Sequence, residues 1–206
     1  MKKSLLFSLF LSCAFFILTS CIPEFVNPLV SPENNKPDPR LLGKWVQKDH
    51  TEQEYMEFFQ KSQGELICKI FEKNSDGINK EQEIPCIASN YNGETFLSVK
   101  FKDAESGETS ENYYIIKYEI KEDKLLFYHF NSDALVKAIK DQKIKGQIKT
   151  YKSSFKPKNK EKPITHDYPI IEDSSENLIS FIKTMSKEAL FEGGEEYQRK
   201  KETDKT

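Results

Sequence analysis

The sequence has few of the residues that enzymes and metal proteins use for their chemistry. It contains three histidines, four cysteines and eight glycines among 206 residues. The histidines, His50, His129 and His166, are far apart and form no His-x-x-x-His or His-Glu-x-x-His arrangement. No Gly-x-Ser-x-Gly elbow and no glycine-rich phosphate loop is present. We therefore expect a protein that is not an enzyme and has no metal and no cofactor.

A large excess of charge of one sign is also missing. The chain has 31 basic and 33 acidic residues, a net charge of −2, which gives no electrostatic reason to bind nucleic acid. One region differs, because between residues 143 and 163 eight lysines are opposed only by Glu161. This region, Lys143–Lys162, is either a solvated loop or a contact for an anionic envelope component such as lipid or polysaccharide. The lysines are Lys143, Lys145, Lys149, Lys152, Lys156, Lys158, Lys160 and Lys162.

Long apolar runs are absent except at the N-terminus. There, Lys2 and Lys3 precede an apolar run from Leu5 to Leu18, and two small residues follow it. This order is the three-part layout of a secretory signal. The run of about fourteen residues would span roughly 21 Å as a helix, less than the roughly 30 Å of a bilayer core. A cleavable signal over residues 1–20 is favoured over a permanent transmembrane helix.

The segment Leu18-Thr19-Ser20-Cys21 resembles the lipobox of bacterial lipoproteins. The resemblance implies cleavage before Cys21, a lipid on its thiol, and lasting attachment to a membrane of the bacterial cell envelope. In many Gram-negative bacteria an Asp after the cysteine retains the protein at the inner membrane; here Ile22 follows, which implies the outer membrane. Two alternatives remain: lipidation at Cys13, and an ordinary secretory signal with a plain thiol at Cys21.

The other two cysteines, Cys68 and Cys86, lie in two segments that predict strands. Between the segments, Asn74-Ser75-Asp76-Gly77 is typical of a hairpin turn. A hairpin centred on Gly77 places Cys68 opposite Cys86, within reach of a disulfide in an oxidising compartment. The alternative is two buried thiols on an apolar strand face. That face also carries Leu66, Ile70, Ile84 and Ala88.

From Lys44 to Phe130, short segments of alternating polarity separated by turns predict a mainly β fold built as an antiparallel meander. A turn at Glu122-Asp123 pairs Tyr118 with Phe127, and the outer face that results needs a cover. Two helices are predicted to supply it. The first is a short helix after the meander, with Asn131-Ser132-Asp133 as its cap. The second starts at Asp173-Ser174-Ser175-Glu176, stops at Gly193-Gly194 and packs on the meander.

The start of the meander, Gly43-Lys44-Trp45, resembles the Gly-x-Trp signature of lipocalins and other calycin barrels. The resemblance implies a lipocalin-like barrel or curved sheet with Gly43 and Trp45 at its base. In lipocalins this tryptophan packs under an arginine from the last strand. We expect the last strand at Lys145–Tyr151, which holds no arginine, while Arg40 and Arg199 lie elsewhere. The contact is therefore expected to be either missing or made by a lysine such as Lys145 or Lys149.

The expected organisation is a signal peptide at 1–20, a lipidated Pro-rich tether at 21–40, a β domain with helices at 41–192, and a disordered polar tail at 193–206. Two functions are compatible with it. A monomeric barrel with a filled interior would act through its surface, as an interaction or inhibitor-like module, which we favour. An open interior of about 300 Å³ or more would instead hold a small apolar ligand. The residues that would line it are Tyr114, Tyr118, Phe127 and His129.

Overall fold

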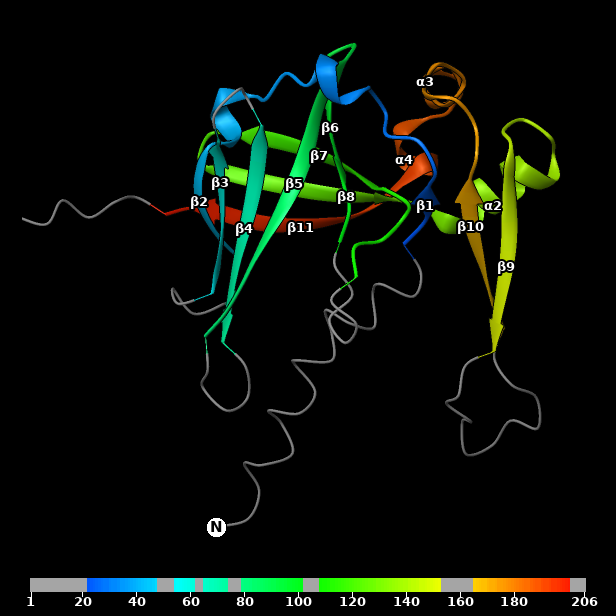
Figure 1. The fold of residues 1–206 in the computed structure, drawn as a ribbon. Helices are drawn as coiled ribbons and strands as arrows, with labels where there is room; N and C mark the ends of the chain where they lie inside the picture. Colours follow the sequence, from blue (N-terminus) through cyan, green and yellow to red (C-terminus); the bar gives the residue numbers. More distant parts are fainter. Residues whose placement is uncertain are drawn as a thin grey trace, which may run out of the picture.

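The computed structural model in Figure 1 describes residues 22–47, 54–61, 65–73, 79–101, 108–152 and 165–200. Several predictions lie outside these residues and are not placed by the structure. They concern the signal segment with Cys21, the turn at 74–78, His50, and the half of the lysine region that holds Lys156, Lys158, Lys160 and Lys162.

In the described part of the chain, eight antiparallel strands form a closed barrel, which confirms the mainly β prediction. The barrel order is β11-β2-β3-β4-β5-β6-β7-β8, so seven strands follow one another along the chain and the eighth comes from the C-terminus. The strands are β2 (Gly43–Gln47), β3 (Tyr55–Gln60), β4 (Leu66–Lys73), β5 (Asn79–Tyr91), β6 (Glu94–Val99), β7 (Tyr114–Lys121), β8 (Lys124–Phe130) and β11 (Phe191–Arg199).

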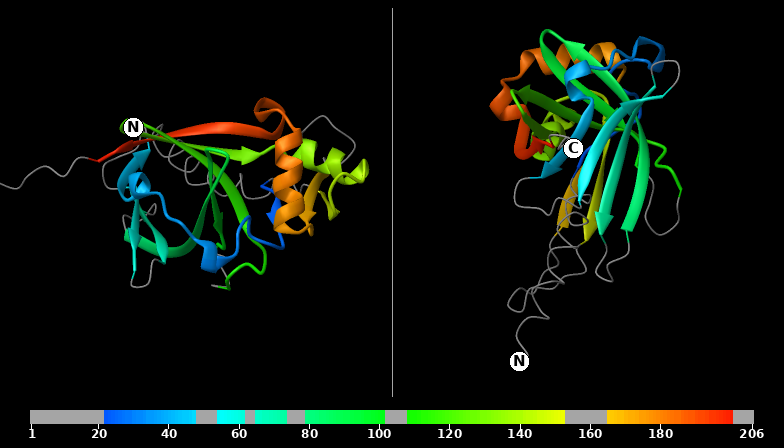
Figure 2. Two further views of the ribbon diagram at one scale, coloured as in Figure 1. Left: turned by 90° about the horizontal axis from the view of Figure 1, so that it is seen from above. Right: turned by 90° about the vertical axis from the view of Figure 1, so that its left-hand side faces the viewer.

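A second sheet and three helices lie beside the barrel, as Figure 2 shows from above. The sheet has the order β1 (Glu24–Phe25), β10 (Thr165–Ile171) and β9 (Gly146–Lys152). The helices are α2 (Ser132–Lys140), α3 (Ser175–Thr184) and α4 (Lys187–Leu190). Together they cover the outer face of β6, β7, β8 and β11, where Phe96, Ile115, Phe130 and Phe191 are buried. The expected cover of this face is therefore present.

Both predicted helix starts are confirmed by their caps. The side chain of Asn131 accepts a hydrogen bond from the Ala134 N–H at 2.9 Å, and that of Ser174 accepts one from the Asn177 N–H at 3.3 Å. The predicted end of the second helix is wrong, because α3 stops at Thr184. A new capping residue, Ser186, starts the short α4 there.

The tail prediction for 193–206 is wrong over its first part, because residues 191–199 form β11. Gly193 and Gly194, with φ of 96° and 128°, do not stop a helix; they lie at an irregularity in the β8–β11 register. The segment expected as the last barrel strand, Lys145–Tyr151, lies in β9 of the second sheet instead.

The Pro-rich segment 21–40 is also not a free tether where it is described. Phe25, Leu29 and, just beyond it, Leu41 are 1%, 1% and 0% exposed. Two short 3-10 helices, η1 (Pro32–Asn34) and η2 (Pro39–Leu41), begin at prolines, which fix the backbone for a helical turn. The proline content alone predicts an extended segment that is detached from the domain. The three buried apolar side chains instead hold it against the domain.

The disulfide prediction is wrong because the hairpin register differs from the expected one. Cys68 lies opposite Ile84, and Cys86 lies opposite Leu66, so the two cysteines are diagonal neighbours and both are free thiols. A diagonal pair is too far apart for a disulfide bond. A shift of two residues leaves every side chain on the same face, so the predicted core residues Leu66, Ile84 and Ala88 are buried as expected.

The register of β7 and β8 is confirmed. Tyr118 pairs with Phe127, and Ile116 pairs with His129. The chain reverses through Glu122, with φ of 55°, and Asp123. A two-residue loop leaves little freedom in the pairing of the flanking strands.

The barrel is closed at one end by Trp45, which is 0% exposed and whose indole N–H donates to the Leu41 carbonyl at 2.7 Å. The Arg199 guanidinium lies 4.1 Å from the centre of its ring and donates to the carbonyls of Leu42, at 2.7 Å, and Arg40. The expectation that this contact is either missing or made by a lysine is thus wrong. Gly43 has φ of +111°, and a Cβ there would lie 3.0 Å from the guanidinium, which explains the glycine.

Replacing Arg199 by lysine should lower the free energy of unfolding by about 1–2 kcal/mol, because an ammonium does not stack on the indole as a planar guanidinium does. Urea denaturation followed by tryptophan fluorescence measures the change. Arg40→Lys is the matched control, since the Arg40 side chain is 64% exposed and forms a surface ion pair with Asp38. Equal effects of the two substitutions would contradict the structural role of Arg199.

Candidate functional site

The barrel interior near Trp45 is filled by the protein's own side chains. Two residues predicted to line a ligand cavity, Tyr118 and Phe127, are 1% and 6% exposed and belong to this core. Phe127 packs edge-on against Tyr197 of β11, with ring centres 5.5 Å apart. Burial raises the pKa of both tyrosines, which keeps their hydroxyls protonated. The other buried residues of this core include Leu41, Phe58, Leu66, Leu97, Val99 and Leu125.

The other two predicted lining residues, Tyr114 and His129, are half-buried and lie at the ends of β7 and β8 that are away from the Glu122-Asp123 turn. His129 Nε2 lies 4.0 Å from Glu195 Oε1, while the Tyr197 hydroxyl donates to Glu195 Oε2 at 3.3 Å. His129 Nδ1 is buried and has no hydrogen-bond partner among the described residues. The hydroxyl in this cluster therefore bonds to the carboxylate and not to the imidazole, an arrangement that does not activate a nucleophile.

The other histidine that the structure describes, His166, lies in the second sheet, at the second residue of β10. His166 borders a hollow of about 450 Å³ at the start of α2, together with Asp133, Asp167 and Glu192. Asp167 already binds Thr150 at 2.9 Å. Among the described residues, no group of three or more His, Cys, Asp or Glu side chains is placed to hold a metal ion.

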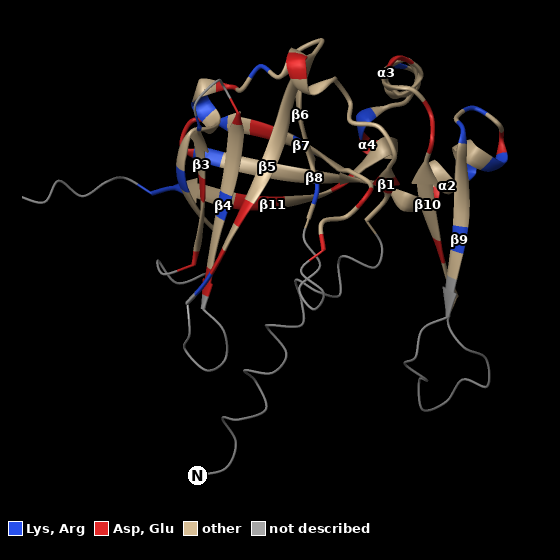
Figure 3. Cartoon of the chain, viewed as in Figure 1, with Lys and Arg blue, Asp and Glu red and all other residues tan. Residues whose placement is uncertain are grey.

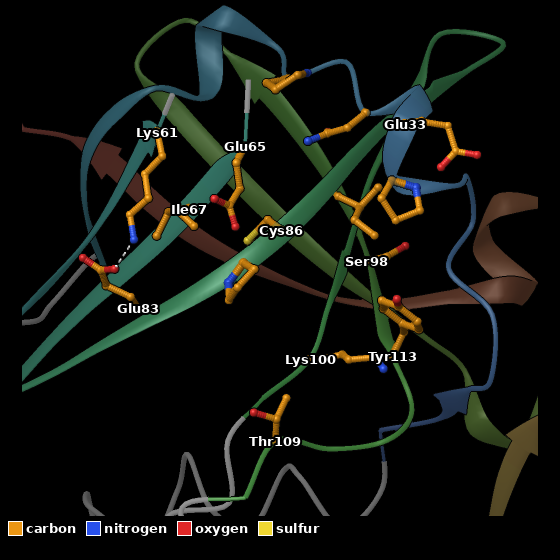
Figure 4. Close-up of a pocket in the computed structure, with 15 residues that line it drawn as sticks. Glu33, Lys61, Glu65, Ile67, Glu83, Cys86, Ser98, Lys100, Thr109 and Tyr113 are labelled. Atoms are coloured by element: carbon orange, nitrogen blue, oxygen red, sulfur yellow. Dashed lines mark hydrogen bonds and ion pairs between the residues drawn. The ribbon is translucent and has the colours of Figure 1, made fainter. Parts of the chain in front are cut away.

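A larger hollow, of about 840 Å³, lies outside the barrel, and we call it the outer groove. One wall is the N-terminal segment 32–37, and the floor is the outer face of β4 and β5 (Figure 4). The wall is held in place by Asn35, whose side chain accepts from the Ala88 N–H at 2.8 Å, and by the Lys36 N–H, which donates to the Ala88 carbonyl at 3.3 Å. The β4–β5 ladder ends at the pair of Leu66 with Cys86, so β4 does not reach Ala88. The N-terminal segment bonds to β5 at this unpaired position.

The outer groove has an apolar floor and a rim of mixed charge. Ile67, Pro85 and Ile87 form the floor. Pro85 lies one residue before the first β5–β6 pair, Cys86 with Val99, where β5 has only one neighbouring strand and tolerates proline. On the rim, Lys61 and Glu83 form an ion pair at 2.7 Å, and their hydrogen bond raises the pKa of Lys61 and lowers that of Glu83. The remaining rim residues include Glu33, Glu65, Lys100 and Tyr113.

Sequence reasoning did not find the outer groove, because its wall and its floor come from separate parts of the chain. The one signal in the sequence was the apolar spacing of Phe25 and Leu29 within a proline-rich stretch, which indicates that the stretch packs on something. Arg199 was missed for a different reason: the bulge at Gly193–Glu195 interrupts the alternation that would have identified β11 as a strand.

Comparisons with protein-family models, with curated proteins and with solved structures found no match. Among the described residues, no helix has the length and apolar character needed to cross a membrane.

The buried thiols should destabilise the fold at alkaline pH. Burial raises the pKa of Cys86 to about 12 and that of Cys68 well above its ordinary value. Above pH 8.5, roughly the ordinary thiol pKa, the unfolded chain loses protons that the folded chain keeps. The free energy of unfolding should therefore fall between about pH 8.5 and 10, by up to about 1.4 kcal/mol per pH unit for each thiol. Urea titrations at several pH values measure the slope.

A Cys68→Ala, Cys86→Ala double variant is the control, since its slope over this range should be shallower. Iodoacetamide should label both thiols only in denaturant, and a reducing agent should leave the melting temperature unchanged. A lower melting temperature on reduction would contradict the free-thiol structure.

Proposed function

We propose that this chain is a bacterial envelope lipoprotein, held on a membrane by a lipid on Cys21, whose folded domain is a non-enzymatic interaction module. The signal layout of residues 1–20 and the lipobox-like Leu18-Thr19-Ser20-Cys21 support the anchor. Ile22, in the place of a retaining Asp, supports the outer membrane.

We also propose that the domain is lipocalin-like. The Gly43-x-Trp45 pattern opens the first strand of an eight-stranded closed barrel. Arg199 of the last strand lies over the tryptophan, which is the contact expected from the resemblance to lipocalins. These two features support the resemblance to lipocalins. The second sheet and the helices α2, α3 and α4 are additions to the barrel.

The position of the hollow space supports an interaction surface. The interior around Trp45 is packed, while the outer groove, a hollow of about 840 Å³, lies outside the barrel. Its apolar floor of Ile67 and Ile87, with charges of both signs on the rim, suits an extended polypeptide segment with apolar side chains flanked by charged ones. We propose such a segment of an envelope protein as the partner.

Binding of a small apolar ligand inside the barrel is the second candidate. It is supported by Met56, Ile70 and Ile116, which pack against the interior core and are only partly buried. The packed core beside them leaves a shallower site than an open barrel would give.

The lysine region remains a proposed contact for an anionic component. Its described members Lys143, Lys145 and Lys149 are exposed. Along the other described elements, basic and acidic residues are interspersed (Figure 3), and we propose the contact for this region alone.

The outer groove is tested by photo-crosslinking in the native host. A photoreactive amino acid at Glu65, on the groove rim, should give a discrete protein adduct, whereas one at the exposed Glu188 of α4 should not. Ile87→Glu should reduce the adduct several-fold, because it places a charge on the apolar floor, while Val26→Glu at an exposed position should not. The same adduct from both positions, or none from Glu65, would reject the groove as the binding surface.

The anchor is tested by Cys21→Ala. The variant should be recovered in the soluble fraction, because no other predicted feature attaches the mature chain to a membrane, whereas Cys13→Ala should stay in the membrane fraction. Mass spectrometry of the N-terminal peptide identifies the lipid. A folded Cys21→Ala protein in the membrane pellet would refute lipid anchoring at this residue.

A further inference from the structure

The second sheet has an edge that no described strand covers. The barrel is closed and so has no free edge. In the second sheet, β1 is joined to the start of β7, because the Phe25 N–H donates to the Tyr113 carbonyl at 2.8 Å. β9 pairs with β10 on one side, and no strand of the described chain lies on its other side (Figure 1). This outer edge of β9 is therefore open to pairing with another chain.

The hydrogen bonds of β10 show which of its backbone groups point toward β9. The Val26 N–H donates to the Ile171 carbonyl at 2.9 Å, so Ile171 directs its backbone groups toward β1. Backbone groups alternate in direction along a strand, so those of Ile170 and Glu172 point toward β9. The Glu172 N–H donates to the Lys145 carbonyl at 3.0 Å, as this alternation requires.

The backbone groups of β9 divide between its two sides in the same way. Gln147 lies opposite Ile170, and Lys149 lies opposite Tyr168, so the N–H and C=O groups of Gln147 and Lys149 point toward β10. The residues that alternate with them point toward the open edge. They are Gly146, Ile148 and Thr150.

The structure around β9 holds this edge in place. β9 pairs with β10 over its whole length. Gly146 packs closely against α2, since a Cβ there would lie 2.5 Å from the Ile170 carbonyl oxygen and 3.0 Å from Ile139 Cδ1. Asp173, which is 6% exposed, accepts a hydrogen bond from the Lys145 N–H at 2.9 Å. An incoming strand would meet an ordered edge, which lowers the entropic cost of binding.

The lysines beside the edge indicate the charge of a partner. Lys145 and Lys149 are exposed, and an even separation along a strand places them on the same face. In the described part of the chain, neither side chain lies in an ion pair. Glu172, which shares this face, accepts a hydrogen bond from the Gln147 amide at 2.5 Å. Acidic side chains on an added strand would therefore meet both lysines.

The same lysines argue against a second copy of this chain as the partner. Two β9 edges that paired with each other would bring their lysines together, and like charges on neighbouring strands are destabilising. Lysine on an edge strand opposes self-pairing but still favours a strand of opposite charge. On the other face of β9, the half-buried Ile148 side chain favours an apolar neighbour.

We infer that the open edge of β9 binds an extended acidic segment of another protein, which adds a strand to the second sheet. Acidic and apolar side chains alternate in this segment, so that acidic ones face Lys145 and Lys149 and an apolar one lies beside Ile148. The inference rests on the proposed contact of the lysine region with an anionic component, and it identifies that component as a polypeptide. It depends neither on a lipid at Cys21 nor on the outer groove.

Amide hydrogen exchange, measured by NMR on residues 21–206, tests whether the edge is open. All described strands and helices lie within this chain. The Ile148 N–H should exchange several-fold faster than those of Gln147 and Lys149, because only the latter two bond to β10. Equal protection at the three positions would show that the edge is covered and would overturn the inference.

The binding probe is a blocked, fluorescent peptide of about eight residues in which glutamate and valine alternate. It should bind with a measurable change in anisotropy and should slow exchange of the Ile148 N–H. Two methylated peptides are the backbone controls, one N-methylated at every valine and one at every glutamate. Binding should be lost with one and kept with the other, since alternate N–H groups point to opposite sides of a strand. Loss with both, or with neither, would contradict strand addition.

A double variant tests the lysines. Lys145→Ala with Lys149→Ala should weaken peptide binding several-fold. Lys80→Ala with Lys121→Ala removes the same charge at exposed positions of the barrel and should leave binding unchanged. Circular dichroism checks that both variants are folded. Equal weakening by the two double variants would show that only the net charge matters and would overturn the inference.

Polyglutamate and phosphatidylglycerol vesicles represent other anionic partners. The alternating peptide should bind several-fold more tightly than polyglutamate with the same number of glutamates. Equal binding of the two, or binding of the vesicles and not of the peptide, would support an anionic contact but overturn the strand addition. If the peptide, polyglutamate and the vesicles all fail to bind, the proposed contact of the lysine region fails as well.

Discussion

The pairing of β11 with both β2 and β8 is the constraint on which the rest of the structure depends. It turns a seven-stranded meander with two free edges into a closed barrel and brings Arg199 over Trp45. Between β8 and β11 the chain leaves the barrel and builds α2, β9, β10, α3 and α4. Because both ends of this excursion are fixed in the barrel, its apolar residues pack on the outer barrel wall and form one continuous cluster with it.

Local signals in the sequence predicted local structure well. The two-residue turn at Glu122-Asp123 determined a register, and Asn131 and Ser174 determined two helix starts. The hairpin of Cys68 and Cys86 shows the limit of such signals. Its turn spans several residues, so the sequence specified which face each side chain occupies, through alternation, but not which residue lies opposite. The core followed from the face alone, whereas a disulfide requires the exact partner.

Features that depend on distant parts of the chain were not predictable in the same way. The outer groove forms because the segment at Asn35 contacts the edge of β5 at Ala88. Nothing in the sequence around either residue indicates that the two segments are neighbours. The bulge at Gly193 and Gly194 looks like a helix stop in sequence, because glycine serves both purposes, and only the unpaired edges of β2 and β8 make a strand the stable choice. These features could not be predicted because they depend on tertiary contacts between segments that are far apart in the sequence.

β11 follows all the other barrel strands in the sequence, which has a consequence for how the protein is made. Synthesis proceeds from the N-terminus, so β2 and β8 exist with open edges until the last strand is complete. The contact of Arg199 with Leu42 joins residues 157 positions apart, and closing so long a loop is entropically expensive and slow. During that interval the nascent sheet offers two templates for pairing with another chain. A truncation that removes β11 would leave both edges open permanently.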